Sequence, residues 1–193
     1  MPATPYLDAD AARARDTRLA DLTDVVIENG VADFEEKAEE YRGVAYTPRD
    51  ATATLRGTTA SFLFLPHLKV SAVESITIDG TALSESELAD VTIWGDEGAL
   101  ERGAGWYATQ IVVAYSHGFD EPPATVLTAC TEYVLCVARS RASGVSRNTL
   151  SEATDAGTTR YSTPDWSAGR PTGWLEVDRL LNSLPDYRTP GLA

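Results

Sequence analysis

The sequence predicts an α+β fold. A helical core, made of an N-terminal helix pair, a long central helix and a short C-terminal helix, carries an inserted antiparallel β-rich block. Apolar residues recur at helical spacing near both ends of the chain, whereas the middle consists of short runs of β-formers separated by turn residues. Strands and helices do not alternate along the chain, so we expect no doubly wound parallel sheet.

Five parts are expected along the chain. They are an N-terminal helical segment (1–43), the β-rich block (44–116), the central helix (117–144), a polar arm or hairpin (145–171) and a C-terminal docking helix with a tail (172–193). A chain of 193 residues can bury roughly 70% of its extended surface. It therefore needs neither a metal nor a disulfide to fold.

The N-terminal segment is predicted to hold two helices. Asp8 is placed to cap a short helix over residues 9–15. Thr23 or Asp24 is placed to cap a longer helix, and Gly43 is placed to end it.

The longer of these helices combines one apolar stripe with acidic sides. The stripe has spacings of four, three, four and three residues: Ile27, Val31, Phe34, Ala38 and Tyr41. The other sides carry acidic residues, among them Glu28, Glu35, Glu36, Glu39 and Glu40. Such a run is usually a solvated helix face, and the alternative is a dedicated acidic lining.

The β-rich block contains five or six short strands by its pattern. Runs such as "DATATLRG", "ASFLFLP" and "ATQIVVAYS" are alternating or continuous β-formers. Asp79-Gly80 follows the run "VESITI" and is a strong tight-turn signal. Connections of hairpin length favour an antiparallel sheet, a small sandwich or a barrel.

The segment "HGFDEPP", residues 117–123, separates the last strand of the block from the central helix. Gly118 relieves the turn, Asp120 or Glu121 is placed to cap the helix, and the two prolines fix its first turn. The alternative is that Asp120 and Glu121 form a catalytic pair. Because every residue of the segment has a structural reason to be there, we interpret it as a corner.

The central helix is the most apolar one in the chain. Its predicted core stripe is Val126, Cys130, Tyr133, Val134 and Val137. Cys130 and Cys136 are six residues apart, which places them on different sides of a helix. They cannot bridge each other or share a metal, and we expect them to be small buried apolar residues.

A polar stretch follows the central helix. Two short β-like pieces flank Asp155-Ala156-Gly157, which predicts a hairpin or an extended arm. The stretch is so poor in aliphatic residues that it is either disordered alone or ordered by a partner. Residues 172–184 then read as a short helix that Thr172 caps and Pro185 ends. This helix either folds back onto its own domain or docks on a neighbour.

No catalytic residue, metal ligand or cofactor-binding residue is predicted. His67 and His117 have no Cys or second His at ligand spacing, so we expect no zinc site. The sequence also contains no G-x-S-x-G elbow and no P-loop. These absences point away from enzymes and toward an assembly protein.

The net charge of −13 bears on the possible partners. Binding to nucleic acid depends mostly on neutralising phosphates, so a chain with 29 acidic and 16 basic residues is not expected to grip DNA. The opening residues "MPATPYLDADAARARD" contain no apolar run, and we expect no secretory signal. No stretch is apolar enough for a membrane span, so we expect assembly in a cytoplasm.

Four motifs occur in a fixed order along the chain. They are the helix end "EEYRG", the strand and corner "VAYSHGFDEPP" that lead into the main helix, the polar hairpin "SEATDAGTTRYS" and the closing helix "PTGWLEVDRLLNSL". In this order they resemble the head–tail connector (head-to-tail adaptor) proteins of long-tailed bacteriophages. The β-rich block is larger than in the minimal, mostly helical members of that family.

The resemblance implies a structural virion protein of the neck, at the head–tail junction. Such proteins form an oligomeric ring, typically of twelve copies, that joins the portal protein to stopper or tail-terminator proteins. DNA passes through the lumen without specific binding, and the five glutamates named above or the central helix would line it. The resemblance implies a portal or neighbour interface on the C-terminal helix and the arm, formed by Trp174, Leu175, Val177, Leu180, Leu181, Leu184, Arg160, Tyr161 and Trp166.

Three other functions are kept as alternatives. One is another role in the same particle, as a stopper, tail-completion or decoration protein. A second is a small hydrolase that uses Ser116, His117 and Asp120. A third is a DNA-binding packaging accessory, whose retention on DNA would fall as salt rises.

Overall fold

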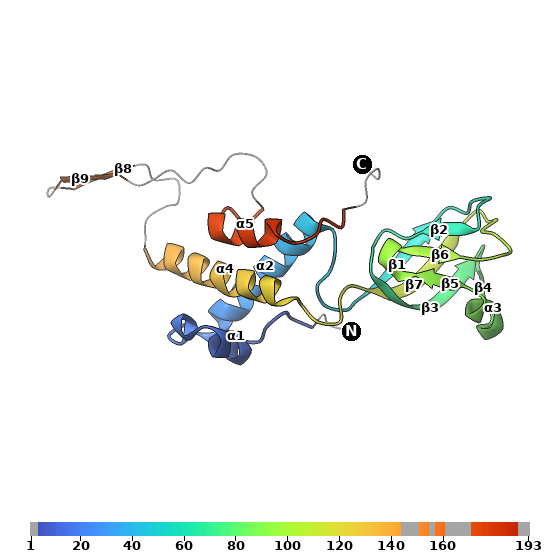
Figure 1. The fold of residues 1–193 in the computed structure, drawn as a ribbon, viewed down its shortest axis with the longest axis horizontal. Coiled ribbons are helices and arrows are strands. Elements are labelled where there is room, and N and C mark those ends of the chain that lie inside the picture. The colour runs from blue at the N-terminus through green and yellow to red at the C-terminus, as the bar shows by residue number, and fades with distance from the viewer. Residues whose placement is uncertain (1–3, 144–150, 155–156, 161–170, 189–193) are drawn as a thin grey trace. The chain divides into compact units, whose positions relative to one another are not determined.

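The structure is a computed structural model that describes residues 4–143, 151–154, 157–160 and 171–188. The chain divides into two compact units (Figure 1). The unit that we call the β unit comprises Met1–Thr4, Arg42–Pro122 and Asp186–Ala193, and the helical unit comprises Pro5–Tyr41 and Pro123–Pro185. Helices and antiparallel sheets both occur, which confirms the predicted α+β class with an inserted β block.

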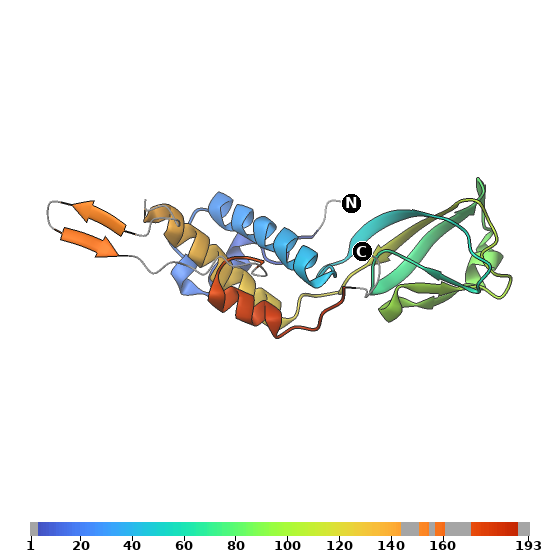
Figure 2. The same ribbon diagram turned by 90° about the horizontal axis from the view of Figure 1, so that it is seen from above.

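The helical unit is built from four α-helices and one 3-10 helix among the described residues. They are α1 (Ala9–Arg15), η1 (Thr17–Leu19), α2 (Asp24–Arg42, which runs one residue past the unit boundary), α4 (Ala124–Ala142) and α5 (Leu175–Asn182). The short helix α5 packs against α4, and both views show the two side by side (Figures 1 and 2). No helix among the described residues is long and apolar enough to cross a bilayer.

The start signals of the first two helices are where the sequence predicts them. Asp8 is the N-cap of α1, and its carboxylate accepts a hydrogen bond of 2.6 Å from the backbone N–H of Ala11. Helix α2 follows Thr23 directly, and Gly43, with a φ of +70°, comes directly after its last residue.

Most of the residues in the predicted apolar stripes of α2 and α4 lie in the core of the helical unit, and Tyr41 and Val137 are half-buried. Ile27, Phe34 and Ala38 of α2 are fully buried, and Val31 is nearly so. The ring of Phe34 lies 6.3 Å from the ring of Tyr6 and 5.7 Å from the ring of Tyr133 in α4. Gly30 faces α4 so closely that a Cβ there would lie 3.0 Å from a methyl carbon of Val134. The glycine therefore lets the two helices approach.

The cap predicted for α4 is wrong. Its N-cap residue is Pro123, and no side chain caps the helix, so neither Asp120 nor Glu121 has that role. Steric contact with a following proline disfavours helical conformation. Glu121 precedes Pro122 and Pro122 precedes Pro123, so neither residue is expected to be helical. The helix can therefore begin no earlier than Pro123, and in the structure its first residue is Ala124, so neither carboxylate is at the N-cap position.

The cap predicted for α5 is also wrong in detail. The N-cap residue is Trp174, with no side-chain cap, and Thr172 lies two residues before it. The Thr172 hydroxyl donates a 2.6 Å hydrogen bond to Asp178, which also accepts from the Thr172 backbone N–H at 3.0 Å. Asp178 is buried, so these two hydrogen bonds fix the start of α5 from within the helix.

The β unit contains two antiparallel sheets. The first has the strand order β1-β7-β3-β4, and the second has the order β2-β6-β5. Their bounds are β1 (Arg49–Leu55), β2 (Phe62–Phe64), β3 (Val70–Ile78), β4 (Thr81–Ala82), β5 (Thr92–Trp94), β6 (Ala99–Glu101) and β7 (Ile111–His117). Side chains from both sheets share one core, which includes Leu63, Ile76, Leu100, Trp106 and Val113.

The turn at Asp79-Gly80 is confirmed, with φ of +47° and +84°. The Asp79 carboxylate also accepts hydrogen bonds from the backbone N–H groups of Thr109 and Gln110, at 2.9 and 2.8 Å. The sequence pattern does not predict β6, which lies within a glycine-rich stretch, or the one-turn helix α3 (Glu85–Ala89). Both elements are too short to show a period of their own.

A two-stranded hairpin follows the helix α4. Strand β8 (Ser151–Thr154) pairs antiparallel with β9 (Gly157–Arg160), so that Ser151 lies opposite Arg160. This agrees with the predicted hairpin, whose turn at residues 155–156 lies outside the described residues.

Candidate interface surfaces

Backbone hydrogen bonds fix the corner between β7 and α4, residues 118–123, to neighbouring segments of the β unit. The Gly118 N–H donates to the carbonyl of Lys69 at 2.9 Å, and the Phe119 N–H donates to the carbonyl of Ala45 at 3.1 Å. Gly118 has a φ of +106°, and a Cβ there would lie 2.4 Å from the carbonyl oxygen of Thr47. Only glycine fits this position, which agrees with a structural role for the corner.

The corner also holds a cation against aromatic rings. The Lys69 ammonium pairs with Asp96 at 2.8 Å and lies 5.3 Å from the ring centroid of Phe119 and 5.8 Å from that of Tyr187. The Tyr187 N–H donates to the carbonyl of Arg42 at 3.0 Å. The segment that follows α5 is thereby attached to the β unit.

The two histidines stack on each other inside the β unit. Their ring centroids are 3.9 Å apart and their planes differ by 6°. Nδ1 of His67 and the Tyr115 hydroxyl share a hydrogen bond of 2.7 Å. Burial, and then the neighbouring charges of His67 and Arg49, lower the pKa of His117 to about 4, and burial also lowers the pKa of His67. Both rings are therefore neutral near pH 7.

The residues of the hydrolase alternative are not assembled into a triad. Ser116 and His117 are consecutive in β7, so their side chains point to opposite faces of the sheet. The Ser116 hydroxyl donates to Asp50 at 2.9 Å, and Asp120 is exposed. The geometry therefore provides no base for Ser116 at His117.

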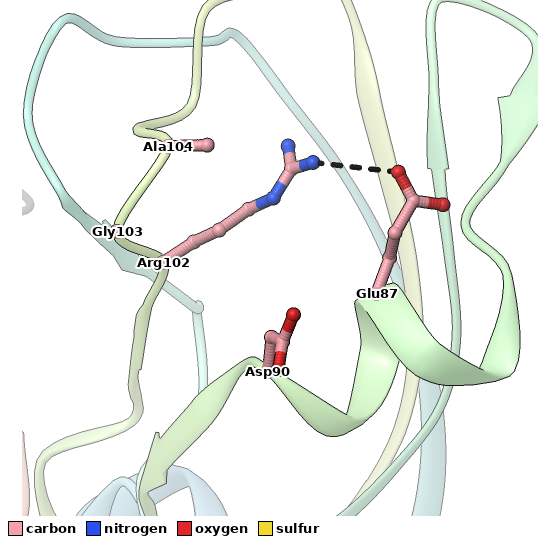
Figure 3. A pocket seen from close by; sticks show the side chains of 5 residues that line it. All are labelled: Glu87, Asp90, Arg102, Gly103 and Ala104. Carbon is pink, nitrogen blue, oxygen red and sulfur yellow. Dashed lines mark ion pairs between the residues drawn. The ribbon is translucent and has the colours of Figure 1, made fainter.

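An open hollow of about 390 Å³ lies beside α3 (Figure 3). Glu87 and Arg102 face each other across it at 3.9 Å, and Asp90 lies at the end of α3. Glu87 already accepts a hydrogen bond from the Ser84 N–H, and the Arg102 guanidinium lies 6.0 Å from the ring of Trp106. Across the described part of the chain, no three His, Cys, Asp or Glu side chains are grouped to hold a metal ion. We see no catalytic arrangement in this hollow.

The five glutamates proposed for an acidic lining divide into two groups. Glu28, Glu36 and Glu40 are exposed on α2. Glu35 and Glu39 are half-buried: Glu35 accepts from the Tyr6 backbone N–H at 2.5 Å, and Glu39 accepts from the Tyr6 hydroxyl at 2.9 Å. The second pair holds the N-terminal segment on α2, so only the first three are free to face a channel.

The residues expected at an interface on α5 also divide by burial. Val177 and Leu181 are fully buried within their own chain, so they anchor α5 and offer nothing to a partner in this conformation. Leu175 is 44% exposed, and Trp174, Leu180 and Leu184 are half-buried. The spacing of apolar residues shows that a helix has an apolar face, but not whether that face is buried in its own chain or binds a partner. The side chain of Arg160, and Tyr161 and Trp166, lie outside what the structure describes.

An exposed set of aromatic rings on the β unit has no counterpart in the sequence prediction. In the sheet β2-β6-β5, Leu63 and Leu100 point into the core, so Phe62, Phe64, Trp94 and Glu101 share the outer face. We call Phe62, Phe64 and Trp94 the aromatic patch. The run "ASFLFLP" is predicted only as a strand, and the register of β2 with β6 places both phenylalanines on the outer face. Because successive side chains of a strand point to opposite faces, the order Phe-Leu-Phe indicates that the two phenylalanines share one face and that Leu63 lies on the other.

Comparisons with known proteins agree with a neck protein at the level of the fold. No family model and no curated protein matches the chain. Among solved structures, a chain from the neck of a native GTA (gene transfer agent) particle, computed with twelvefold symmetry, matches with a TM-score of 0.58 and 14% identity, over 99% of this chain and 98% of that one. A chain from the neck of an empty GTA particle, computed with sixfold symmetry, matches with a TM-score of 0.59 and 14% identity, over 76% of this chain and 88% of that one. This chain therefore shares its fold with chains from the necks of GTA particles, which agrees with the resemblance found in its sequence.

Proposed function

We propose that this chain is a structural virion protein of the neck, which forms a ring between the portal of the capsid and the tail and lets DNA pass through its lumen. The observation that carries the proposal is the fold match to a neck chain, which spans almost the full length of both chains. Both units of the molecule are included in a match of that extent. The twelvefold symmetry of the matched neck supports a ring of twelve copies.

The charge of the molecule suits a channel for DNA. Exposed carboxylates on a lumen wall repel phosphates and keep the genome mobile, whereas a basic wall would hold it. Glu28, Glu36 and Glu40 lie along the exposed side of α2 and are the best candidates for such a wall. Glu35 and Glu39 are weaker candidates for the wall, because their carboxylates accept hydrogen bonds from Tyr6.

The C-terminal helix is the proposed contact with the portal. Leu175, with half-buried Trp174 before it, presents apolar area to solvent at the start of α5. Trp is a frequent source of binding energy where it becomes fully buried in an interface. Leu180 and Leu184 would add to the contact through the parts that α4 leaves uncovered.

The proposal is tested by imaging the purified chain alone and mixed with the portal of the same particle. We expect rings of about twelve copies, coaxial with the portal, in two-dimensional class averages. Leu175→Asp should abolish the joint complex and leave rings of the chain intact. Val25→Asp, which makes the same kind of change at an exposed apolar position outside α5, is the matched control.

Two results would contradict the proposal. A monomer that neither forms rings nor associates with the portal would exclude the ring. A ring that binds only the tail side, and not the portal, would favour a stopper or tail-completion protein instead.

A further inference from the structure

The aromatic patch is the largest group of exposed rings in the described chain. Phe64 is 63% exposed, Trp94 is 45% exposed and Phe62 is 37% exposed. They flank the short middle strand β6, with Phe64 and Trp94 on either side of buried Ala99. Exposed apolar groups gathered on one face of a soluble domain usually mark an interaction surface.

A carboxylate is fixed within this patch. The indole N–H of Trp94 donates a hydrogen bond of 3.0 Å to Oε2 of Glu101, and Phe62 lies opposite Glu101 in the neighbouring strand. Ring faces attract a cation, and a carboxylate accepts hydrogen bonds from a guanidinium. Because Arg combines a flat cation with several donors, the chemistry of the patch matches an arginine better than a lysine.

One arginine of the β unit is available for such a contact. Among the cations of residues 43–122, Lys69 pairs with Asp96, Arg102 pairs with Glu87 and Arg49 donates to the carbonyl of Thr4. Arg56, which follows β1, is exposed and makes no hydrogen bond or ion pair with any residue that the structure describes. Arg56 directly follows β1, which is an edge strand of the sheet that does not carry the aromatic patch.

We propose that neighbouring copies of this chain bind each other through their β units, with Arg56 of one copy against the aromatic patch and Glu101 of the next. This inference rests on the proposed ring. A ring requires two different, complementary surfaces on every copy, and Arg56 and the patch are such a pair. Aromatic residues and arginine are also the residue types most enriched at protein interfaces.

A charge exchange tests the pairing in the full chain. Arg56→Glu and Glu101→Arg should each weaken association between copies by on the order of tenfold, and the double variant should recover most of it. Glu74→Arg makes the same change of charge on an exposed glutamate of β3 and should have no effect. Arg56→Glu combined with Glu74→Arg should therefore not recover association.

A second pair of variants tests the rings themselves. Phe64→Ser removes an aromatic side chain that is 63% exposed, and Val25→Ser removes an apolar side chain of α2 that is 64% exposed. Only Phe64→Ser should weaken association. Mass photometry over a dilution series measures the fraction in rings, and circular dichroism checks that each variant is folded.

The outcomes separate this inference from the proposed function. If the unaltered chain forms rings and all variants form them equally well, the ring stands, and the aromatic patch belongs to a different partner. If the single variants weaken the ring and the double variant does not recover, the pairing of Arg56 with Glu101 is wrong. If the unaltered chain forms no ring, both proposals are overturned.

Discussion

The helical unit and the β unit differ in how many large apolar side chains they leave exposed to solvent. In the helical unit the apolar stripes are buried, and the only large apolar side chains exposed in its described residues are Val25 and Leu175. The β unit has a complete core of its own and still exposes Phe62, Phe64, Ile93, Trp94 and Tyr107. The helical unit therefore leaves few large apolar side chains exposed outside α5, whereas the β unit leaves a larger group of them at its surface.

The largest effect is expected from removing one core ring in each unit. Phe34→Ala and Trp106→Ala each delete a fully buried side chain, which should cost about 3–5 kcal/mol of the stability of the host unit. Trp106→Ala also removes the donor of a 2.7 Å hydrogen bond to the carbonyl of Ser61. Hydrogen exchange, followed by mass spectrometry, should show loss of protection in α4 for the first variant and in β7 for the second.

Equal loss of protection in both units, from either variant, would mean that they unfold together. In that case the two units would differ in their exposed apolar side chains but not in their stability. A conservative change, Phe34→Leu, serves as the control for the helical unit.

Next in size is the effect of Gly118→Ala at the corner. A methyl group there would meet the Thr47 carbonyl oxygen, and the residue has a positive φ, so we expect a loss of about 2–3 kcal/mol in the β unit. Gly80→Ala is the matched control, since Gly80 also has a positive φ but has open space around it. It should cost only about 1 kcal/mol. Urea unfolding measures both, and similar losses would contradict the steric explanation.

A pH-dependent effect from a buried histidine is expected in the β unit. The folded-state pKa of His117, about 4, is below its ordinary value of 6.5. The unfolded chain therefore binds a proton that the folded chain does not, and stability falls as the pH drops through this window. The groups that face the stacked pair are Tyr115, Arg49 and Asp50.

We expect a loss on the order of 2 kcal/mol between about pH 7 and pH 4.5. His117→Phe keeps a flat ring against His67 but cannot titrate, and it should flatten this part of the pH profile. Urea unfolding of both proteins at the two pH values measures the difference. Parallel profiles would show that other groups, and not His117, cause the pH dependence.

The smallest effect concerns the two groups of glutamates on α2. Glu35→Ala removes the acceptor of the Tyr6 N–H and should cost about 1 kcal/mol. Glu36→Ala changes an exposed neighbour and should stay within about 0.5 kcal/mol. Thermal unfolding compares the two variants. An equal cost would mean that the N-terminal segment does not depend on Glu35.

The parts of the fold that depend on neighbours in sequence could be predicted. Asp8 caps α1, Ile27, Val31, Phe34 and Ala38 form one buried stripe, and Asp79-Gly80 makes a turn. Each of these signals is local, because caps, helical periods and tight turns involve residues that are only a few positions apart.

What could not be predicted depends on distant partners or on very short elements. The role of Glu35 and Glu39 depends on Tyr6, which is 29 and 33 residues away. The exposure of Phe62 and Phe64 follows from the register of β2 with β6, and β6 has only three residues. The buried side of α5 faces α4, so Val177 and Leu181 could not be separated from Leu175 by the pattern alone.

The environment of Lys69 has a practical consequence for labelling chemistry. Its hydrogen bond to Asp96 raises the pKa of the amine, so the group stays protonated and reacts poorly with acylating reagents. The rings of Phe119 and Tyr187 also shield it. Detachment of the segment around Tyr187 would uncover the amine, and the rate of its acylation would then report, at a single atom, whether that segment is attached or released.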